Sequence, residues 1–212
     1  MGFLHIYCGD GKGKTTAAAG QALRMAGCGK KAVIVRFLKN EDSGEVAALR
    51  GIPQVNVLSC EESFGFTWQM TEKEKQKAAE YYKKQFEAAC LEAERCCREA
   101  EEGCAVASEG CAVAERSYAV QEKSREEAEK FPDPKADVLF VMDELCAAVN
   151  AGLLDLTSVL EFLDSRPSNL EVVVTGRKPH KELLARADYV TEMRLISHPY
   201  GNGIPARKGI EY

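Results

Sequence analysis

The sequence lacks the features that mark several common classes of protein. Its nine cysteines form no C-x-x-C pair, and only three histidines accompany them. Neither a disulfide framework nor a zinc site is therefore predicted, and reduced thiols are typical of cytosolic proteins. No apolar run approaches the ~20 residues that a membrane-spanning helix needs. The N-terminus has no basic region ahead of an apolar segment, so no signal peptide is predicted.

The chain also lacks an excess of positive charge. Its net charge of -5 argues against a protein that coats nucleic acid. We therefore expect a cytoplasmic protein with no nucleic-acid or membrane partner, in which local groups hold any anionic ligand. A length of 212 residues with 45% hydrophobic content predicts a single domain, residues 1–212, with one substantial core.

One glycine-rich stretch lies between a predicted strand, residues 3–8, and a predicted helix, residues 17–26. The stretch consists of Gly9, Asp10, Gly11, Lys12, Gly13, Lys14, Thr15 and Thr16. In this context its glycines let backbone N–H groups close on phosphate oxygens, Lys14 supplies a charge, and the Thr15 hydroxyl is a ligand for Mg²⁺. The motif predicts a site for a nucleoside triphosphate. The alternative is a surface turn capped by Thr15.

Five further segments rich in β-branched and apolar residues are predicted as strands. They are residues 31–38, 54–58, 137–142, 171–175 and 189–194. Helical segments separate most of them, including residues 155–163, and this alternation is typical of right-handed βαβ crossovers. The predicted fold is α/β, with a mostly parallel six-stranded sheet of the P-loop NTPase (RecA-like) kind. Ligands of such sheets bind at the carboxyl ends of the strands.

Charged residues follow two of these strands at the edge where the phosphate loop is expected. Asp143 and Glu144 end the fourth strand, and carboxylates at this place are typical ligands of a magnesium–nucleotide complex. Their alternative role is to cap the next helix. Arg177 follows the fifth strand, where its guanidinium could bind phosphate oxygens in a bidentate manner. Its alternative role is a surface ion pair.

The loop at residues 61–70 carries Phe64, Phe66 and the single tryptophan, Trp68. Such a loop is either a lid over an apolar ligand or a plug that packs onto the core. Its spacing favours neither.

Residues 71–130 are rich in Glu, Lys, Ala and Cys, which predicts helix. Cysteine recurs every seven residues, at Cys90, Cys97, Cys104 and Cys111, with alanine three residues after each. This stripe predicts a close packing seam between two helices, or alternatively a metal or redox site. A single 60-residue helix would be about 90 Å long. We therefore expect an inserted helical hairpin at about residues 75–130 that turns at Gly103 or Gly110.

Several of these motifs occur together in one known family. They are residues 7–16 (YCGDGKGKTT), 29–39 (GKKAVIVRFLK), 65–69 (GFTWQ), 139–145 (LFVMDEL), Arg166-Pro167, 172–177 (VVVTGR) and 209–212 (GIEY). Together they closely resemble the P-loop ATP:corrinoid adenosyltransferases, also called cob(I)alamin or cob(I)yrinic acid a,c-diamide adenosyltransferases. The resemblance covers nearly everything outside residues 75–130, a segment far longer than the family's usual crossover.

The resemblance implies an enzyme that transfers the 5′-deoxyadenosyl group of ATP to a Co(I) corrinoid and releases triphosphate. It implies that Gly9 to Thr16 hold the triphosphate, that Lys14 and Arg177 balance its charge, and that Thr15, Asp143 and Glu144 serve Mg²⁺. Phe66 and Trp68 would fill the lower face of the corrinoid and exclude its lower ligand. The resemblance also implies a homodimer and a cobalt-reducing partner such as a flavodoxin.

Two other functions remain open at the level of sequence. The phosphate loop and Glu144 would also suit another P-loop phosphotransferase or ATPase. A nucleotide-dependent corrinoid-binding regulatory module, docking through the cysteine-rich hairpin, is the second alternative. The tail at residues 197–212 is expected to be an ordered flap or a partner contact.

Overall fold

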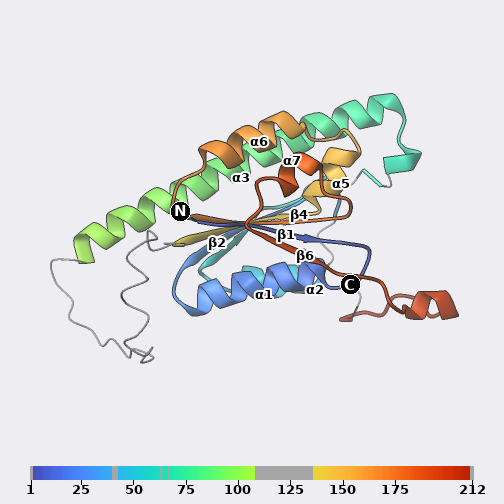
Figure 1. Ribbon diagram of the computed structural model, residues 1–212, viewed down its shortest axis with the longest axis horizontal. Helices are drawn as coiled ribbons and strands as arrows, with labels where there is room; N and C mark the ends of the chain where they lie inside the picture. Colours follow the sequence, from blue (N-terminus) through green and yellow to red (C-terminus); the bar gives the residue numbers. More distant parts are fainter. Residues whose placement is uncertain (1, 40–42, 63, 66, 108–135, 211–212) are drawn as a thin grey trace.

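The computed structural model describes residues 2–39, 43–62, 64–65, 67–107 and 136–210 (Figure 1). Its elements are β1 (Leu4–Cys8), α1 (Lys14–Gly27), β2 (Lys31–Arg36), α2 (Gly44–Arg50), β3 (Val55–Val57), η1 (Thr67–Gln69), α3 (Glu72–Ala107), β4 (Val138–Asp143), α5 (Leu145–Asn150), α6 (Leu156–Ser165), β5 (Leu170–Thr175), α7 (Lys181–Leu184), β6 (Tyr189–Glu192) and η3 (Pro199–Asn202).

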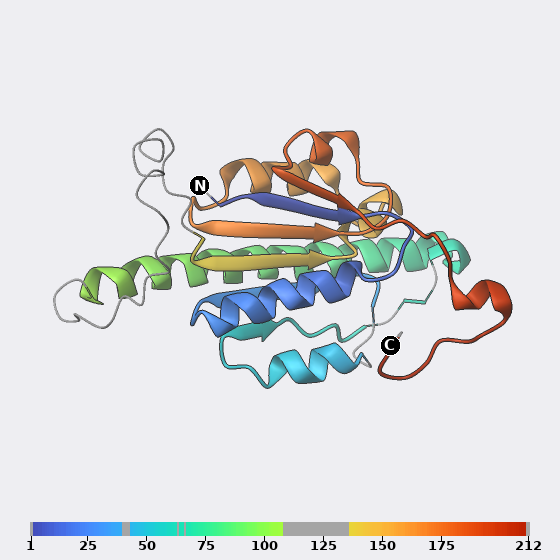
Figure 2. The same ribbon diagram turned by 60° about the horizontal axis from the view of Figure 1, so that its bottom comes forward.

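The six strands form one sheet in the order β3-β2-β4-β5-β1-β6. Every neighbouring pair is parallel, so the sheet is wholly parallel rather than mostly so. Helices α1 and α2 cover one face, and α3, α5, α6 and α7 cover the other (Figures 1 and 2). The inner strand β4 is buried along its whole length because both of its faces are covered, which explains its nearly continuous apolar sequence. The predicted α/β class is confirmed.

Helix α1 begins at Lys14, earlier than the predicted start at residue 17, because Gly13 turns the chain in the left-handed region with φ 108°. Residues 14–16 therefore form the first turn of the helix, whose backbone N–H groups have no partner within the helix. The predicted strand at residues 31–38 ends instead at Arg36. Leu38 leaves the strand conformation with φ 56°.

Helix α3 is one continuous helix of 36 residues, about 54 Å long. It passes through Gly103 without a turn, so the prediction of a hairpin turn there is wrong; a glycine inside a helix lowers its stability but does not by itself end it. Figure 2 shows α3 extending beyond both ends of the sheet. Gly110 and the second arm of the predicted hairpin lie outside the described residues.

The described part of the cysteine stripe packs against the sheet and not, as the sequence predicted, against a second helix. Cys90, Ala93 and Cys97 are buried in the core beneath α3, which contacts β2, β4 and β5. Burial raises the pKa of the Cys97 thiol to about 12 and also raises that of Cys90. These thiols are therefore protonated core groups. Of the other two stripe cysteines, the side chain of Cys104 and the whole of Cys111 lie outside the description.

Candidate nucleotide site

A cavity of about 650 Å³ lies beside the phosphate loop at the carboxyl ends of the strands. It is lined by residues 10–16, Ala19, Lys39, Gly44, Glu45, Glu144, Arg177, His198, Ala206, Gly209 and Ile210. The parallel sheet explains this assembly, since the segments that follow β1, β2, β4 and β5 all emerge at one edge. Of the predicted loop, all residues except Gly9 line the cavity directly.

Gly9 and Gly11 let the phosphate loop pass close to the segment that follows β6. The Gly11 N–H donates a hydrogen bond to the Met193 carbonyl oxygen at 2.7 Å. A Cβ atom added to Gly9 would lie 2.3 Å from that same oxygen, and Gly9 has φ 102°. Asp10 extends the contact, because its Oδ1 accepts a hydrogen bond from the Leu195 N–H at 2.9 Å. The loop is therefore held in shape by the chain after β6.

Lys14 lies at the base of the loop, with 7% of its surface exposed. Its ammonium donates a hydrogen bond to the Gly11 carbonyl oxygen at 2.8 Å. Burial lowers the pKa of Lys14; Glu144 opposes this shift, and Arg177 adds a smaller lowering. An anion bound in the cavity would favour the charged form of Lys14 again, so the position of Lys14 suits the binding of phosphate.

Asp143 and Glu144 take different places although they are adjacent in sequence. Asp143 is buried, and its Oδ1 accepts hydrogen bonds from the hydroxyls of Thr15 at 3.0 Å and Thr175 at 2.6 Å. Glu144 instead lines the cavity. Its backbone has φ 58°, and its N–H donates to the Thr175 hydroxyl at 2.9 Å. Glu144 also occupies the N-cap position of α5, but its side chain makes no capping hydrogen bond.

Lys39 completes this group, and the sequence reasoning did not find it. Its ammonium lies 2.6 Å from Asp143 Oδ2 and donates to the Thr15 hydroxyl at 2.7 Å. Lys39 comes shortly after β2, at the same edge as Arg177 after β5. The rule that identified Arg177, a cation just beyond a parallel strand, could therefore have identified Lys39.

Arg177 is exposed and lines the cavity from the β5 side. Gly176 precedes it with φ 141°, and a Cβ added there would lie 2.6 Å from Cβ of Cys146. The carbonyl oxygen of Arg177 accepts a hydrogen bond from Asn150 Nδ2 at 3.2 Å. The backbone therefore holds the turn that places Arg177 in the wall of the cavity.

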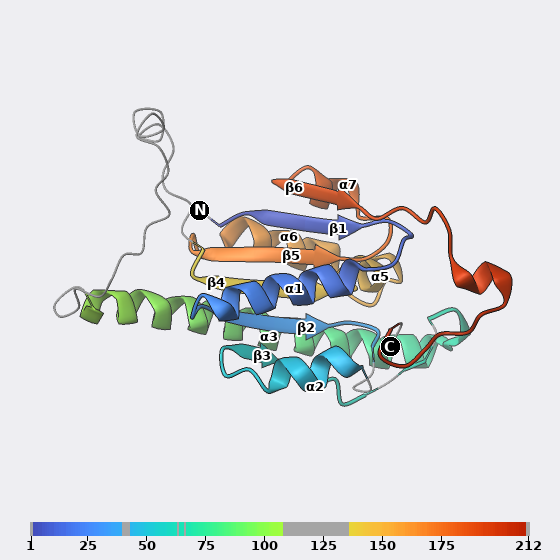
Figure 3. The ribbon, with the colours of Figure 1, turned by 90° about the horizontal axis from the view of Figure 1, so that it is seen from below.

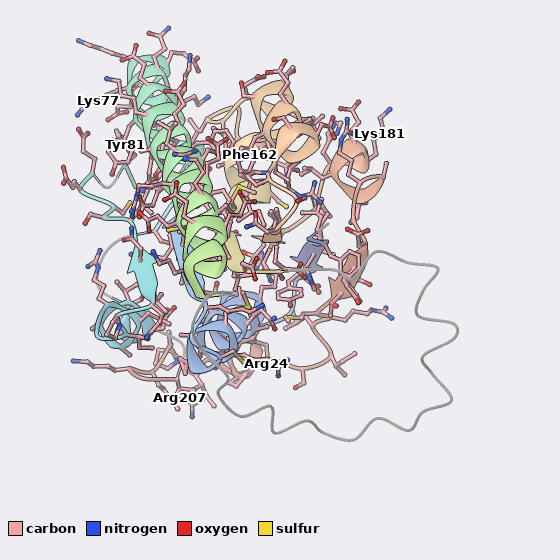
Figure 4. All side chains as sticks on the ribbon, turned by 90° about the vertical axis from the view of Figure 1, so that its left-hand side faces the viewer. Arg24, Lys77, Tyr81, Phe162, Lys181 and Arg207 are labelled. Carbon is pink, nitrogen blue, oxygen red and sulfur yellow. The ribbon has the colours of Figure 1, made fainter. Side chains whose placement is uncertain are left out.

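Within the aromatic loop, Phe64 acts as a plug. Its ring centroid lies 5.5 Å from that of Tyr81 and 5.7 Å from that of Tyr82, on α3, and Lys77 lies over the ring. Figure 4 shows Lys77 and Tyr81 on one flank of α3 and Phe162 of α6 on the other. Phe66 lies outside the described residues. Trp68 is placed only by its backbone, in η1, so its predicted role remains a prediction.

The chain after β6 contributes cavity residues that were not predicted as site residues, although Gly209 and Ile210 belong to the GIEY motif. His198, Ala206, Gly209 and Ile210 line the cavity. Figure 3 shows this tail passing beyond the carboxyl ends of the strands and returning toward α2. The tail therefore lies at the cavity, and its predicted role as an ordered flap or a partner contact stays a prediction.

These features define a P-loop nucleotide-binding protein. The sheet is parallel, a glycine loop leads into α1, and the adjoining cavity is lined by a buried cation, Lys14, and an exposed one, Arg177. Comparison with known proteins gives the family. The family model described as ATP:corrinoid adenosyltransferase BtuR/CobO/CobP matches residues 1–212. The chain belongs to the ATP:corrinoid adenosyltransferase family. It is therefore assigned to the transferases that move an adenosyl group, and a P-loop phosphotransferase or ATPase is not favoured.

Individual relatives agree with this assignment. The corrinoid adenosyltransferase of Pseudomonas aeruginosa is 32% identical over 100% of this chain and 84% of its own length. The corrinoid adenosyltransferase CobA of Salmonella typhimurium is 32% identical over 100% and 86%, and that of Escherichia coli K12 is 31% identical over the same shares. Within the described ranges, no helix is long and apolar enough to cross a membrane.

Proposed function

We propose that this chain transfers the 5′-deoxyadenosyl group of ATP to a Co(I) corrinoid and thereby contributes to adenosylcobalamin biosynthesis or corrinoid salvage. The cobalt(I) electron pair forms the cobalt–carbon bond to C5′ while the C5′–O bond breaks, and its electron pair leaves with triphosphate. Cobalt(I) is a strong nucleophile, so the protein need not supply a nucleophile or a general base. One observation carries the proposal: in this member of the family, the phosphate loop, Glu144 and Arg177 line the same cavity.

In this proposal the phosphate loop holds the triphosphate through its backbone N–H groups and the first turn of α1. Lys14 and Arg177 stabilise the negative charge that develops on the leaving triphosphate. Both side chains line the cavity, one buried and one exposed. Holding the phosphates at the loop leaves the sugar carbon to be aligned with cobalt, and such alignment is a large contribution to catalysis.

The residues present fit Mg²⁺. The Thr15 hydroxyl lies 3.0 Å from the Asp143 carboxylate, and Glu144 lines the same cavity. All three offer oxygen atoms, the ligands that Mg²⁺ prefers, and Mg²⁺ usually binds through one or two carboxylates together with substrate phosphates. We propose that Thr15 and Glu144 hold the ion, with Asp143 orienting Thr15. The ion would supply charge neutralisation on the triphosphate.

We propose that Phe66 and Trp68 contact the lower face of the corrinoid and keep water away from cobalt. Support comes from the anchoring of the same loop by Phe64 against α3, which holds the segment before Phe66 near the carboxyl edge of the sheet. A cytoplasmic location, a homodimer and a cobalt-reducing partner such as a flavodoxin complete the proposal, by resemblance to the family.

We also propose a single domain over residues 1–212, with an insertion at about residues 75–130 of which only residues 110–130 are dispensable for chemistry. Cys90 and Cys97 belong to the core, so deletion of residues 90–115 would remove core contacts. Deletion confined to residues 110–130 should leave adenosylation intact. Loss of turnover in a folded deletion variant would instead favour the regulatory module in which this segment docks.

The decisive test is an anaerobic assay with ATP, Mg²⁺ and chemically reduced cobalamin, followed by the spectrum of the cobalt–carbon bond. We expect adenosylcobalamin and triphosphate as products. Orthophosphate or ADP without an adenosylated corrinoid would contradict the proposal and favour another P-loop ATPase or phosphotransferase.

In the same assay, Trp68→Ala should reduce turnover while leaving the Kd of ATP nearly unchanged. A parallel loss of ATP binding would indicate a structural role for Trp68.

A further inference from the structure

Lys39 places a monovalent cation between two groups that belong to the magnesium site of the proposed function. Its ammonium contacts the Thr15 hydroxyl at 2.7 Å and Asp143 Oδ2 at 2.6 Å. The Asp143 side chain is 2% exposed and that of Lys39 is 26% exposed. A buried carboxylate is stabilised by hydrogen bonds and by a nearby positive charge. The Thr15 and Thr175 hydroxyls donate the hydrogen bonds, and Lys39 supplies a positive charge. The lysine reaches this position from the wall of the phosphate cavity, which it also lines.

The local backbone holds Lys39 at this point. Leu38 adopts φ 56°, a conformation that is costly for a leucine and that turns the chain toward the cavity immediately before Lys39. The Cys60 thiol donates a hydrogen bond to the Lys39 carbonyl oxygen at 2.9 Å. The backbone is therefore anchored, while the flexible side chain can move between Asp143 and the cavity.

A divalent cation held by Thr15 beside Asp143 would take over the neutralisation of this carboxylate. Two cations so close together repel each other, whereas the bound polyphosphate offers the ammonium a new anionic partner. The two positions of Lys39 are thus favoured by different ligand states of the same cavity.

We propose that Lys39 is a displaceable internal cation. Without ligand it neutralises Asp143, and on entry of the magnesium–nucleotide complex it leaves Asp143 and contacts the polyphosphate. Lys39 is then a positioning residue that keeps the Thr15–Asp143 pair intact before the ligand arrives, and a third phosphate-binding cation beside Lys14 and Arg177 afterwards. The second state of this inference rests on the proposed function, and the first experiment rests on the proposed magnesium site alone.

The first experiment measures the thermal midpoint Tm of nucleotide-free protein with and without 10 mM MgCl₂. Lys39→Met removes the ammonium that forms an ion pair with the buried Asp143 carboxylate, so Tm should fall by about 5 °C or more. Magnesium should restore about half or more of that loss, and it should change the Tm of the wild-type protein by about 1 °C or less. A merely structural lysine would give a loss that magnesium does not restore.

Two variants serve as controls for this measurement. Lys31 forms an ion pair with Glu99 on the surface of α3, away from the cavity, and Lys31→Met should show no magnesium-dependent recovery. Adding Asp143→Asn to Lys39→Met removes the carboxylate that needs a cation, so the double variant should lose the magnesium response. Equal magnesium responses in wild type and Lys39→Met would overturn the proposal.

The second experiment tests the contact with phosphate. In Asp143→Asn the ammonium has no carboxylate to neutralise, so binding of inorganic triphosphate in EDTA isolates its attraction to phosphate. Adding Lys39→Met to this variant should weaken triphosphate binding by about tenfold. Equal affinities would overturn this part of the proposal. Failure of wild-type protein to bind ATP would instead refute the proposed function, while the nucleotide-free Tm data would still decide the role of Lys39.

Discussion

Thr175→Val tests whether one buried hydroxyl holds the two acidic residues of the site in place. The hydroxyl donates to Asp143 Oδ1 at 2.6 Å and accepts from the Glu144 N–H at 2.9 Å. Valine has nearly the same shape, so the substitution removes hydrogen bonds without opening a cavity. A hydrogen bond to a carboxylate contributes about 1.5–3 kcal/mol, and one between neutral groups about 1 kcal/mol.

The free energy of unfolding of Thr175→Val should therefore fall by about 3 kcal/mol. For a chain of this size that corresponds to a decrease in Tm of about 6–12 °C. Urea unfolding followed by circular dichroism measures the first quantity, and thermal unfolding the second. The affinity for magnesium–ATP should also fall, because Glu144 loses the hydrogen bond that supports its left-handed backbone conformation.

Thr175→Ser keeps the hydroxyl and should lose only about 1 kcal/mol, the contribution of one methyl group. Thr157→Val, at an exposed position on α6, controls for the change of residue type and should stay within about 0.5 kcal/mol of wild type. If Thr175→Val were as stable as Thr175→Ser, the hydroxyl would not bridge Asp143 and Glu144, and this reasoning would be refuted.

Three other predictions concern the loop and the thiols. Gly9→Ala should abolish ATP binding and lower Tm, because the added Cβ would lie 2.3 Å from the Met193 carbonyl oxygen. Gly20→Ala is the control: it lies in open space within α1 and should raise the free energy of unfolding by about 0.5–1 kcal/mol. Burial lowers the pKa of Lys14, and bound phosphate would raise it again, so ATP binding at alkaline pH should take up protons and the affinity for ATP should decrease as pH rises. Calorimetry in buffers of different ionisation enthalpy would detect this uptake, and its absence would contradict the lowered pKa of Lys14. Native-state labelling mapped by mass spectrometry should modify exposed Cys28 rapidly and Cys90 only after unfolding; rapid labelling of Cys90 would contradict its burial.

The fold and the phosphate loop could be predicted well because they depend on local features. Strand-length apolar runs separated by helical segments indicate a parallel sheet, and a glycine run between strand and helix indicates the loop. Gly9 and Gly13 adopt the positive φ values that such a loop requires. Arg177 was found because a strand end is recognisable in sequence.

Other assignments could not be made from sequence because they depend on which element a side chain packs against. The seven-residue stripe predicted a seam with a second helix, but the same period also fits packing against a sheet. Cys90 and Cys97 meet the sheet. Phe64 could equally have been lid or plug, and only the neighbouring Tyr81 and Tyr82 decide that it is a plug.

The sequence by itself determined the elements and the chemistry available at each strand end, since backbone conformation and hydrophobic period are properties of short segments. Only the tertiary structure decided that Asp143 is buried while Glu144 faces the cavity, and that Thr15, Lys39 and Thr175 all contact Asp143. The physical reason is the strand order. β4 lies between β2 and β5, and β5 lies beside β1, so Thr15 and Thr175, which are 160 positions apart, are brought to one edge of the sheet.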